Sequence, residues 1–100
     1  MFERLKKIFG GSPAVIQQLV TNGAIFIDVR TPAEFKTGHI PGAQNIPLDI
    51  LYQMIDYVKQ LNKPVITICR TGARSAIAKD ILTSAGIHAQ NGGAWTNFKK

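Results

Sequence analysis

Two short runs of mostly β-branched residues limit the fold of this chain more than any other feature of its sequence. Residues 24–29 (AIFIDV) stay apolar until Asp28, and residues 65–68 (VITI) lead directly to Cys69. Strands that lack a regular alternation of polar and apolar side chains are typical of parallel sheets, because helices cover both faces of such a sheet. The sequence therefore predicts two buried parallel strands with helices between them.

Helical patterns flank and separate these strands. Ser12-Pro13 offers an N-cap followed by proline at the first helical position, and Asn22-Gly23 is typical of a helix end, so a helix is predicted between them. A longer amphipathic helix is predicted between Pro47 and Pro64, because apolar residues recur there every three or four positions. These residues are Leu48, Leu51, Ile55, Val58 and Leu61.

The remaining elements are predicted to be a helix and shorter pieces. Residues 75–85 form an alanine-rich helical pattern in which Ile77, Ile81 and Leu82 are expected to face inward. Residues 31–34 (TPAE) have the pattern of a capping box that starts a single helical turn. Residues 43–46 suffice only for an edge or abbreviated strand, and residues 87–90 are predicted to form a last strand.

Strands that alternate with helices predict an α/β domain with an open, mainly parallel sheet of four to five strands and helices on both faces. One hundred residues, of which 45% are apolar, allow one hydrophobic core and no second domain. We expect a basic N-terminal segment at residues 1–11 and the folded domain at residues 12–100. Packing of residues 1–9 on the domain is the favoured interpretation, and docking to a membrane surface or to a partner is the alternative.

The single cysteine excludes an intramolecular disulfide and a zinc site built from several thiolates, and it favours a reducing compartment. No apolar run approaches the roughly 20 residues that cross a bilayer, and the N-terminus lacks the apolar core of a secretory signal. We therefore expect a cytoplasmic protein. The formal net charge is +6, and many of the lysines are dispersed along the sequence. This dispersion favours a surface that attracts small anions over a nucleic-acid interface.

The loop between the second buried strand and the alanine-rich helix carries the chemistry, at residues 69–74 (CRTGAR). It follows the carboxyl end of a strand, where open α/β sheets bind ligands. Unpaired amides at a helix N-terminus, a turn at Gly72 and the guanidinium groups of Arg70 and Arg74 all favour an anion. An ordinary thiol, with a pKa of about 8.5, is mostly protonated at neutral pH, whereas thiols in such surroundings have lower pKa values. Cys69 is therefore predicted to be a thiolate and a nucleophile.

Other interpretations of these residues are weaker. If Cys69 were only a small buried residue that ends a strand, the arginines and the helix start beside it would have no shared purpose. No catalytic Cys-His pair is recognisable, because His39 and His88 lie in other segments, and the three residues lack the spacing of zinc ligands. We expect no metal and no cofactor.

Several segments together closely resemble the single-domain rhodanese family of sulfurtransferases, over about residues 12–96. They are residues 28–30 (DVR), 34–35 (EF), 38–43 (GHIPGA), 45–47 (NIP), 69–75 (CRTGARS) and 91–95 (NGGAW). The resemblance implies a reaction in which Cys69 takes the outer sulfur of a donor such as thiosulfate and becomes a persulfide. That sulfur then passes to cyanide or to a thiol, of a small molecule or a protein.

The resemblance and the loop chemistry together assign the candidate site. The residues expected to bind the small anionic donor are Arg70, Thr71, Gly72, Ala73, Arg74 and Ser75. Arg70 is expected to face outward, and Arg74 to lie closer to the loop backbone. Asp28 and Arg30 are expected to form an ion pair at a strand end, and support of the pocket is their alternative role. We expect a shallow loop that exposes the sulfur of Cys69 to many acceptors.

Two other functions stay open. A binding or regulatory module would keep the fold and hold an acidic group of a partner in the same anion pocket. A Cdc25-type phosphatase is the second alternative. Phosphatases of that type have five residues between the cysteine and the arginine and an acidic residue within the loop, whereas this loop has four residues between Cys69 and Arg74 and no acidic one. The shorter loop favours sulfur over phosphate.

Overall fold

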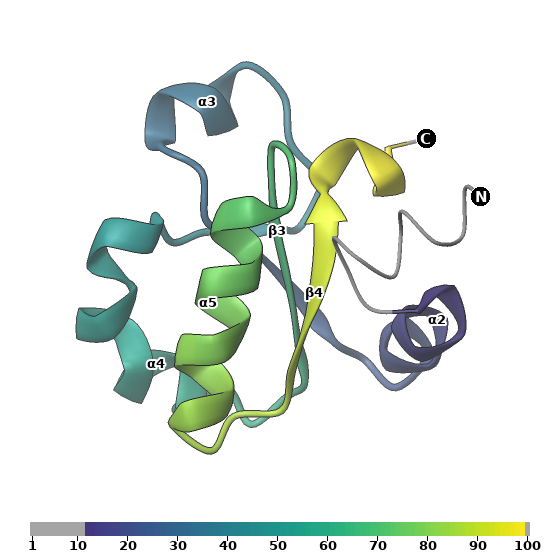
Figure 1. Ribbon diagram of the computed structural model, residues 1–100, viewed down its shortest axis with the longest axis vertical. Helices are drawn as coiled ribbons and strands as arrows, with labels where there is room; N and C mark the ends of the chain where they lie inside the picture. Colours follow the sequence, from purple (N-terminus) through teal and green to yellow (C-terminus); the bar gives the residue numbers. More distant parts are fainter. Residues whose placement is uncertain (1–11, 100) are drawn as a thin grey trace.

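Four parallel strands form the centre of the structure, a computed structural model that describes residues 12–99 (Figure 1). The strands are β1 (Ile25–Asp28), β2 (Gln44–Asn45), β3 (Val65–Cys69) and β4 (Ala89–Ala94), in the order β2-β1-β3-β4. The two apolar strands β1 and β3 occupy the middle of the sheet, and the short β2 lies at an edge, as predicted. The expectations for residues 1–11 lie outside the described residues.

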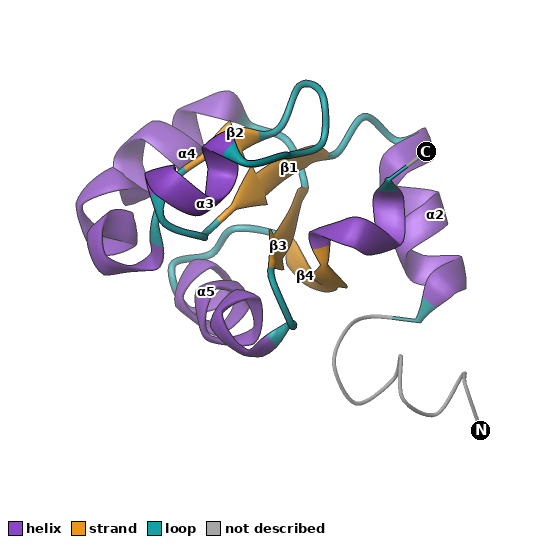
Figure 2. Cartoon of the chain, turned by 90° about the horizontal axis from the view of Figure 1, so that it is seen from above, coloured by secondary structure: helices purple, strands orange, loops and turns teal. Residues whose placement is uncertain are grey.

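Helices cover both faces of the sheet, which confirms the predicted α/β architecture (Figure 2). The helical elements are α2 (Pro13–Thr21), α3 (Pro32–Lys36), the 3₁₀ helix η1 (Leu48–Met54), α4 (Ile55–Leu61), α5 (Ala73–Ser84) and the 3₁₀ helix η2 (Trp95–Phe98). One face packs against η1, α4 and α5, and the other against α2 and η2. Within residues 12–99, no helix combines the length and the apolar character needed to cross a bilayer.

The pleat of β3 decides which way Cys69 faces. Ile66 and Ile68 are buried with residues of α2 and η2, whereas Val65 and Cys69 are buried in the cluster that includes α4 and α5. Alternate residues of a strand point to opposite faces. Cys69 therefore lies under the helix that follows it in the chain.

Helix α5 begins earlier and is rotated relative to the prediction. It starts at Ala73, and its buried residues are Ser75, Ala78 and Leu82, while Ile77 is 53% exposed instead of facing inward. Small side chains at positions three residues apart let the helix axis approach the sheet closely. The hydrogen bonds of the buried Ser75 fix this rotation, although it leaves the apolar side chain of Ile77 exposed.

Two other elements differ from the predicted ones. The segment after Pro47 begins as the 3₁₀ helix η1, with the Ile50 amide bonded to the Pro47 carbonyl at 3.0 Å, and becomes α-helical only at Ile55. Strand β4 runs through the glycines instead of ending before them, because a register shift between Thr67 and Ile68 of β3 accommodates one extra residue. That residue is Gly92, where a Cβ would lie 2.6 Å from Ile66 Cγ2.

Candidate functional site

The register of the two central strands brings the candidate residues to one edge of the sheet. Asp28 pairs with Ile68, so β1 and β3 end side by side, and the cysteine loop starts where β3 ends. The short helix α3 follows β1 and stands at the same end of the molecule as this loop (Figure 1). The site therefore lies at the carboxyl edge of the parallel sheet, as expected for an open α/β fold.

The sulfur of Cys69 lies in a cradle of donors at the start of α5. The Gly72 amide donates to Sγ at 3.0 Å and the Ser75 amide at 3.4 Å. Gly72 is the N-cap of α5, with φ +103°, and its own side chain has no atom that could cap the helix. Sγ accordingly accepts the hydrogen bonds that a capping side chain normally accepts from a helix N-terminus.

Cys69 is fully buried, and its pKa is lower than that of an ordinary thiol. Burial alone raises this pKa, but hydrogen bonds from the Ser75 hydroxyl and from the amides of Ser75, Gly72 and Thr71 lower it by more. The sulfur has no exposed surface in this structure, contrary to the shallow, open loop expected from the sequence. A reagent reaches Sγ only when the loop or the side chain moves.

A buried polar network holds the loop from the side of β4. The Ser75 hydroxyl lies 3.4 Å from Sγ and 2.6 Å from Oδ1 of Asn91. Asn91 Nδ2 donates to the Gly72 carbonyl at 3.2 Å, and the Gly93 amide donates to Asn91 Oδ1 at 2.8 Å. On the other side, Thr67 Oγ1 donates to the Ser75 carbonyl at 2.8 Å. Side chains of β3 and β4 thus fix the first turn of α5.

Arg74 turns toward α3 and forms a bidentate ion pair with Glu34, with N–O distances of 2.7 and 2.9 Å. Glu34 also completes the predicted capping box with Thr31. The hydrogen bond from Arg74, followed by that from the Thr31 amide, lowers the pKa of Glu34 to about 2. The same pair raises the pKa of Arg74. Arg74 was expected nearer the loop backbone, and the structure shows its side chain bound to a carboxylate of another segment.

Asp28 and Arg30 form the predicted ion pair, at 2.7 Å and almost fully buried. The Arg30 guanidinium also donates to the carbonyls of Glu34, at 3.2 Å, and Gly38, at 2.7 Å. Its face lies 4.7 Å from the centre of the Trp95 ring. With these four partners, Arg30 is a structural link between the end of β1 and the α3 region.

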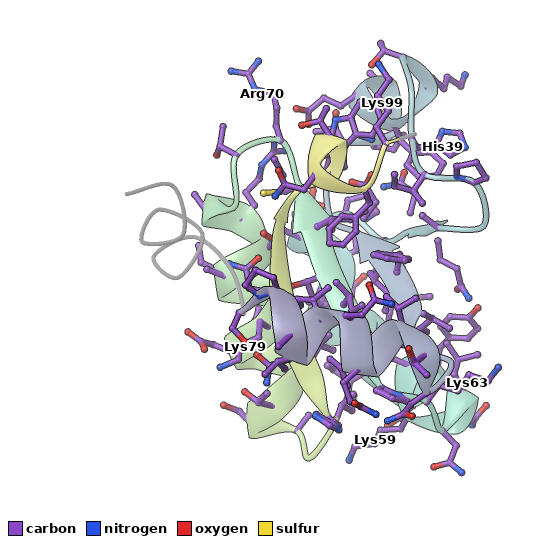
Figure 3. All side chains as sticks on the ribbon, turned by 90° about the vertical axis from the view of Figure 1, so that its right-hand side faces the viewer. His39, Lys59, Lys63, Arg70, Lys79 and Lys99 are labelled. Atoms are coloured by element: carbon purple, nitrogen blue, oxygen red, sulfur yellow. The ribbon has the colours of Figure 1, made fainter. Side chains whose placement is uncertain are left out.

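The opening above the loop is a depression of about 390 Å³ with one outward-facing arginine. Its lining consists of Arg30, Ala33, Glu34, Thr37, Arg70 and Trp95. The exposed Arg70 side chain points away from the body of the molecule (Figure 3). Within residues 12–99 no carboxylate forms an ion pair with it. Thr71 and Ala73 are exposed on the same loop, whereas Gly72 and Ser75 are buried.

Sequence reasoning missed two residues of this site. Asn91 and Glu34 were noted only within segments that resemble the family, and Glu34 also as a capping residue. A polar residue directly before two glycines, in a strand next to that of Cys69, was the signal available for Asn91. His39 stacks on Phe35 instead of approaching the cysteine. Across residues 12–99, no group of three or more His, Cys, Asp or Glu side chains is arranged to hold a metal ion.

Comparison with known proteins identifies the family that this chain resembles. The profile of the Rhodanese-like domain matches residues 12–97. A thiosulfate sulfurtransferase GlpE from Ectopseudomonas mendocina is 33% identical over 85 residues, which are 82% of this chain and 77% of that protein. The human single-domain sulfurtransferase TSTD1 superposes with a TM-score of 0.69 and 28% identity, over 88% of this chain and 93% of that one.

A longer solved chain contains a similar region. The reduced CoADR-RHD of Bacillus anthracis is 37% identical, with a TM-score of 0.64, over 80% of this chain. The matched region is only 14% of the Bacillus anthracis chain. This likeness therefore concerns one domain of a larger protein.

Proposed function

This chain belongs to the rhodanese-like domain family, and on that premise we propose that it is a sulfurtransferase that works through a persulfide on Cys69. The observation that carries the proposal is the cradle around Sγ, in which two backbone amides donate to the sulfur and its pKa is lowered. A thiolate, and not a thiol, is the nucleophile in sulfur chemistry. A relative at 33% identity is named a thiosulfate sulfurtransferase, which supports the choice of donor.

The first half-reaction forms the persulfide. The Cys69 thiolate attacks the outer sulfur of thiosulfate, the bond between the two donor sulfurs breaks, and sulfite leaves with the electron pair. The negative charge of Cys69 then lies on the outer sulfur of the persulfide. The loop amides are donors that would stabilise this charge. Arg70, exposed at the opening, is the group we assign to donor attraction.

The second half-reaction returns the cysteine to its thiolate form. An acceptor thiolate attacks the outer sulfur, the bond to Sγ breaks, and Cys69 leaves with the electron pair. The product is the persulfide of the acceptor, or thiocyanate where cyanide is the acceptor. Both half-reactions balance without a metal, a cofactor or an outside oxidant. A free thiol at the centre of this cycle needs a reducing compartment, and we propose the cytoplasm.

The intact mass of the protein after incubation with thiosulfate tests the proposal. We expect a gain of one sulfur atom on the wild-type chain, its loss on addition of a thiol, and no gain in Cys69→Ser. A wild-type protein that never gains sulfur, while an active sulfurtransferase treated in parallel does, would exclude the persulfide mechanism. Retained binding of an acidic partner by Cys69→Ser would then indicate a binding module, and turnover of a phosphate ester would indicate a phosphatase.

A further inference from the structure

We infer that Ser75 and Asn91 act as a hydrogen-bond switch that positions the Ser75 hydroxyl proton according to the charge of Cys69. The hydroxyl proton of Ser75 points to Asn91 Oδ1 while Cys69 is neutral and turns to Sγ when Cys69 is a thiolate. Both are positioning residues, because they act on the nucleophile and touch no substrate. The purpose of the switch rests on the proposed function, but its existence does not.

The orientation of the Asn91 side-chain amide follows from its backbone partners. The Gly93 N–H needs an acceptor and lies 2.8 Å from Oδ1, and the Gly72 carbonyl needs a donor and lies 3.2 Å from Nδ2. Exchanging the oxygen and the nitrogen would place two donors together and two acceptors together. Asn91 therefore presents its oxygen to Ser75.

This orientation locates the only hydroxyl proton of Ser75. Asn91 Oδ1 accepts and cannot donate, so the bond of 2.6 Å between the two oxygens requires the proton of Ser75. Ser75 Oγ then faces Sγ, 3.4 Å away, with a lone pair. In this state the serine can accept the S–H of a neutral Cys69. It cannot donate to a thiolate.

Ionisation of Cys69 reverses what the serine must supply. A lone pair that faces a thiolate is repelled, whereas rotation about the Cβ–Oγ bond turns the proton to Sγ and adds a charge-assisted hydrogen bond. Asn91 Oδ1 keeps the Gly93 amide as a donor, so the rotation leaves no acceptor without a partner. Ser75 and Asn91 are 0% and 8% exposed, which favours exchange between protein partners.

The switch matches the movement of charge in the proposed cycle. When Sγ attacks a donor, its charge passes to the outer sulfur, and Sγ becomes a poor acceptor that releases the hydroxyl to Asn91. When an acceptor removes the outer sulfur, the charge returns to Sγ and the hydroxyl follows it. No proton leaves Ser75 at either step. The hydrogen bond is thus strongest in the state that leaves as a thiolate.

Charged groups near the cysteine stay in place in the variants that test this inference. Arg74 of α5 interacts electrostatically with Cys69 and is itself paired with Glu34 of α3. Asp28 and Arg30 at the end of β1 are paired with each other, and Arg70 faces outward. A change in the titration of Cys69 on substitution of Ser75 or Asn91 therefore reports their hydrogen bonds.

The test measures the rate of Cys69 alkylation by iodoacetamide as a function of pH. The midpoint of the curve is the readout, because a change in access to the buried sulfur scales the whole curve without moving it. Ser75→Ala should raise the midpoint pH. At a pH below the midpoint, the alkylation rate relative to its high-pH plateau should then fall roughly tenfold, because one hydrogen bond to a charged group is lost. Ser75→Thr, which keeps a hydroxyl, should restore the wild-type midpoint. Ser84→Ala, at the exposed end of the same helix, is the matched control.

Asn91→Ala distinguishes the switch from a fixed serine donor. Removing Oδ1 frees the hydroxyl, so the midpoint should respond to Asn91→Ala when Ser75 is present and much less in the Ser75→Ala background. Equal shifts in both backgrounds, or an unchanged midpoint in Ser75→Ala, would overturn the inference.

If Asn91→Ala does not fold, the Gly93 amide proton of the wild-type protein provides the deciding measurement. Its NMR chemical shift should change with pH as Cys69 ionises, and this change should be smaller in Ser75→Ala. If the variants show the expected midpoints but the wild-type protein never gains sulfur from thiosulfate, the proposed function is refuted and the inference stands.

Discussion

Glu34 and Arg74 are 40 positions apart in the sequence and form a bidentate ion pair that joins α3 to the first turn of α5. The same carboxylate accepts the amide and the hydroxyl of Thr31 in the capping box of α3. One side chain therefore holds both the start of α3 and the first turn of α5. Because the cysteine loop ends in that turn, its shape depends on a segment that follows a different strand.

Glu34→Gln should separate the two roles of this carboxylate. Glutamine keeps an oxygen for the capping box but loses the charge that orients Arg74, so we expect slower persulfide formation. The loss of unfolding free energy at pH 7 should be below about 1 kcal/mol, because both side chains of the pair are about one-third exposed. Stopped-flow measurement of sulfite release and urea unfolding at pH 7 check the two effects.

The same variant gives a defined pH dependence. The pKa of Glu34 is lowered from 4.5 to about 2 in the folded protein, so its contribution to stability is fully present above about pH 4.5. It is lost as the pH falls toward 2. The stability difference between the wild type and Glu34→Gln should therefore shrink between pH 5 and pH 2. A difference that stays constant over this range would contradict the importance of the charged form.

Asp28→Asn should be much more destabilising. It leaves the Arg30 guanidinium, with a side chain only 3% exposed, without its counter-charge. Breaking one side of a buried ion pair costs about 3–5 kcal/mol. Urea unfolding measures the loss, and Asp80→Asn is the matched control, since Asp80 is 78% exposed and lies 3.9 Å from Lys79. A loss below about 1 kcal/mol in Asp28→Asn would mean that the Arg30 charge is satisfied by its backbone partners and Trp95 alone.

The lowered pKa of Cys69 makes stability depend on pH above neutrality. Its folded pKa lies below its unfolded one, so the thiolate contributes stability that is fully present above the unfolded value, about 8.5, and is lost as the pH falls through the folded value. The stability of the wild type relative to Cys69→Ser should therefore increase as the pH rises from the folded pKa toward about 9. Urea unfolding under reducing conditions across this range gives the difference, and a decrease would show that burial outweighs the cradle.

The main elements and the loop position could be predicted because they depend on local patterns. The apolar runs of β1 and β3, the proline and capping signals of α2 and α3, and the glycine turn before α5 are each set by a few neighbouring residues. The edge position of β2 followed from its shortness. Local preference and tertiary structure agree at all of these positions.

The features that could not be predicted depend on partners far along the chain. Ile77 was expected inside on periodicity, but the bonds of Ser75 to Cys69 and Asn91 set the rotation of α5. Gly92 lies within a strand because β4 passes close to Ile66, which no local pattern reveals. The burial of Sγ and the turn of Arg74 toward Glu34 likewise arise from the packing of α3 and α5 around the loop.

The effect of salt tests whether Arg70 attracts an anionic donor. Arg70 is exposed at the opening and, within residues 12–99, forms no ion pair with a carboxylate. Its positive charge can therefore attract an anion from solution. Screening lengths fall from about 30 Å at 0.01 M to about 8 Å at physiological ionic strength. The second-order rate of persulfide formation from doubly charged thiosulfate should therefore fall as salt rises, whereas sulfur transfer to an acceptor that attacks as a singly charged thiolate should change less.

Two variants that each remove one positive charge separate steering by Arg70 from the effect of net charge. Arg70→Gln should slow capture of thiosulfate several-fold at low salt and flatten its salt dependence. Lys59→Gln removes the same charge at the opposite end of the molecule and should leave both nearly unchanged (Figure 3). Stopped-flow rates of the two half-reactions over a salt series give the comparison. Equal slopes in Arg70→Gln and Lys59→Gln would show that the formal net charge of +6 acts as a whole and that Arg70 has no special part in donor capture.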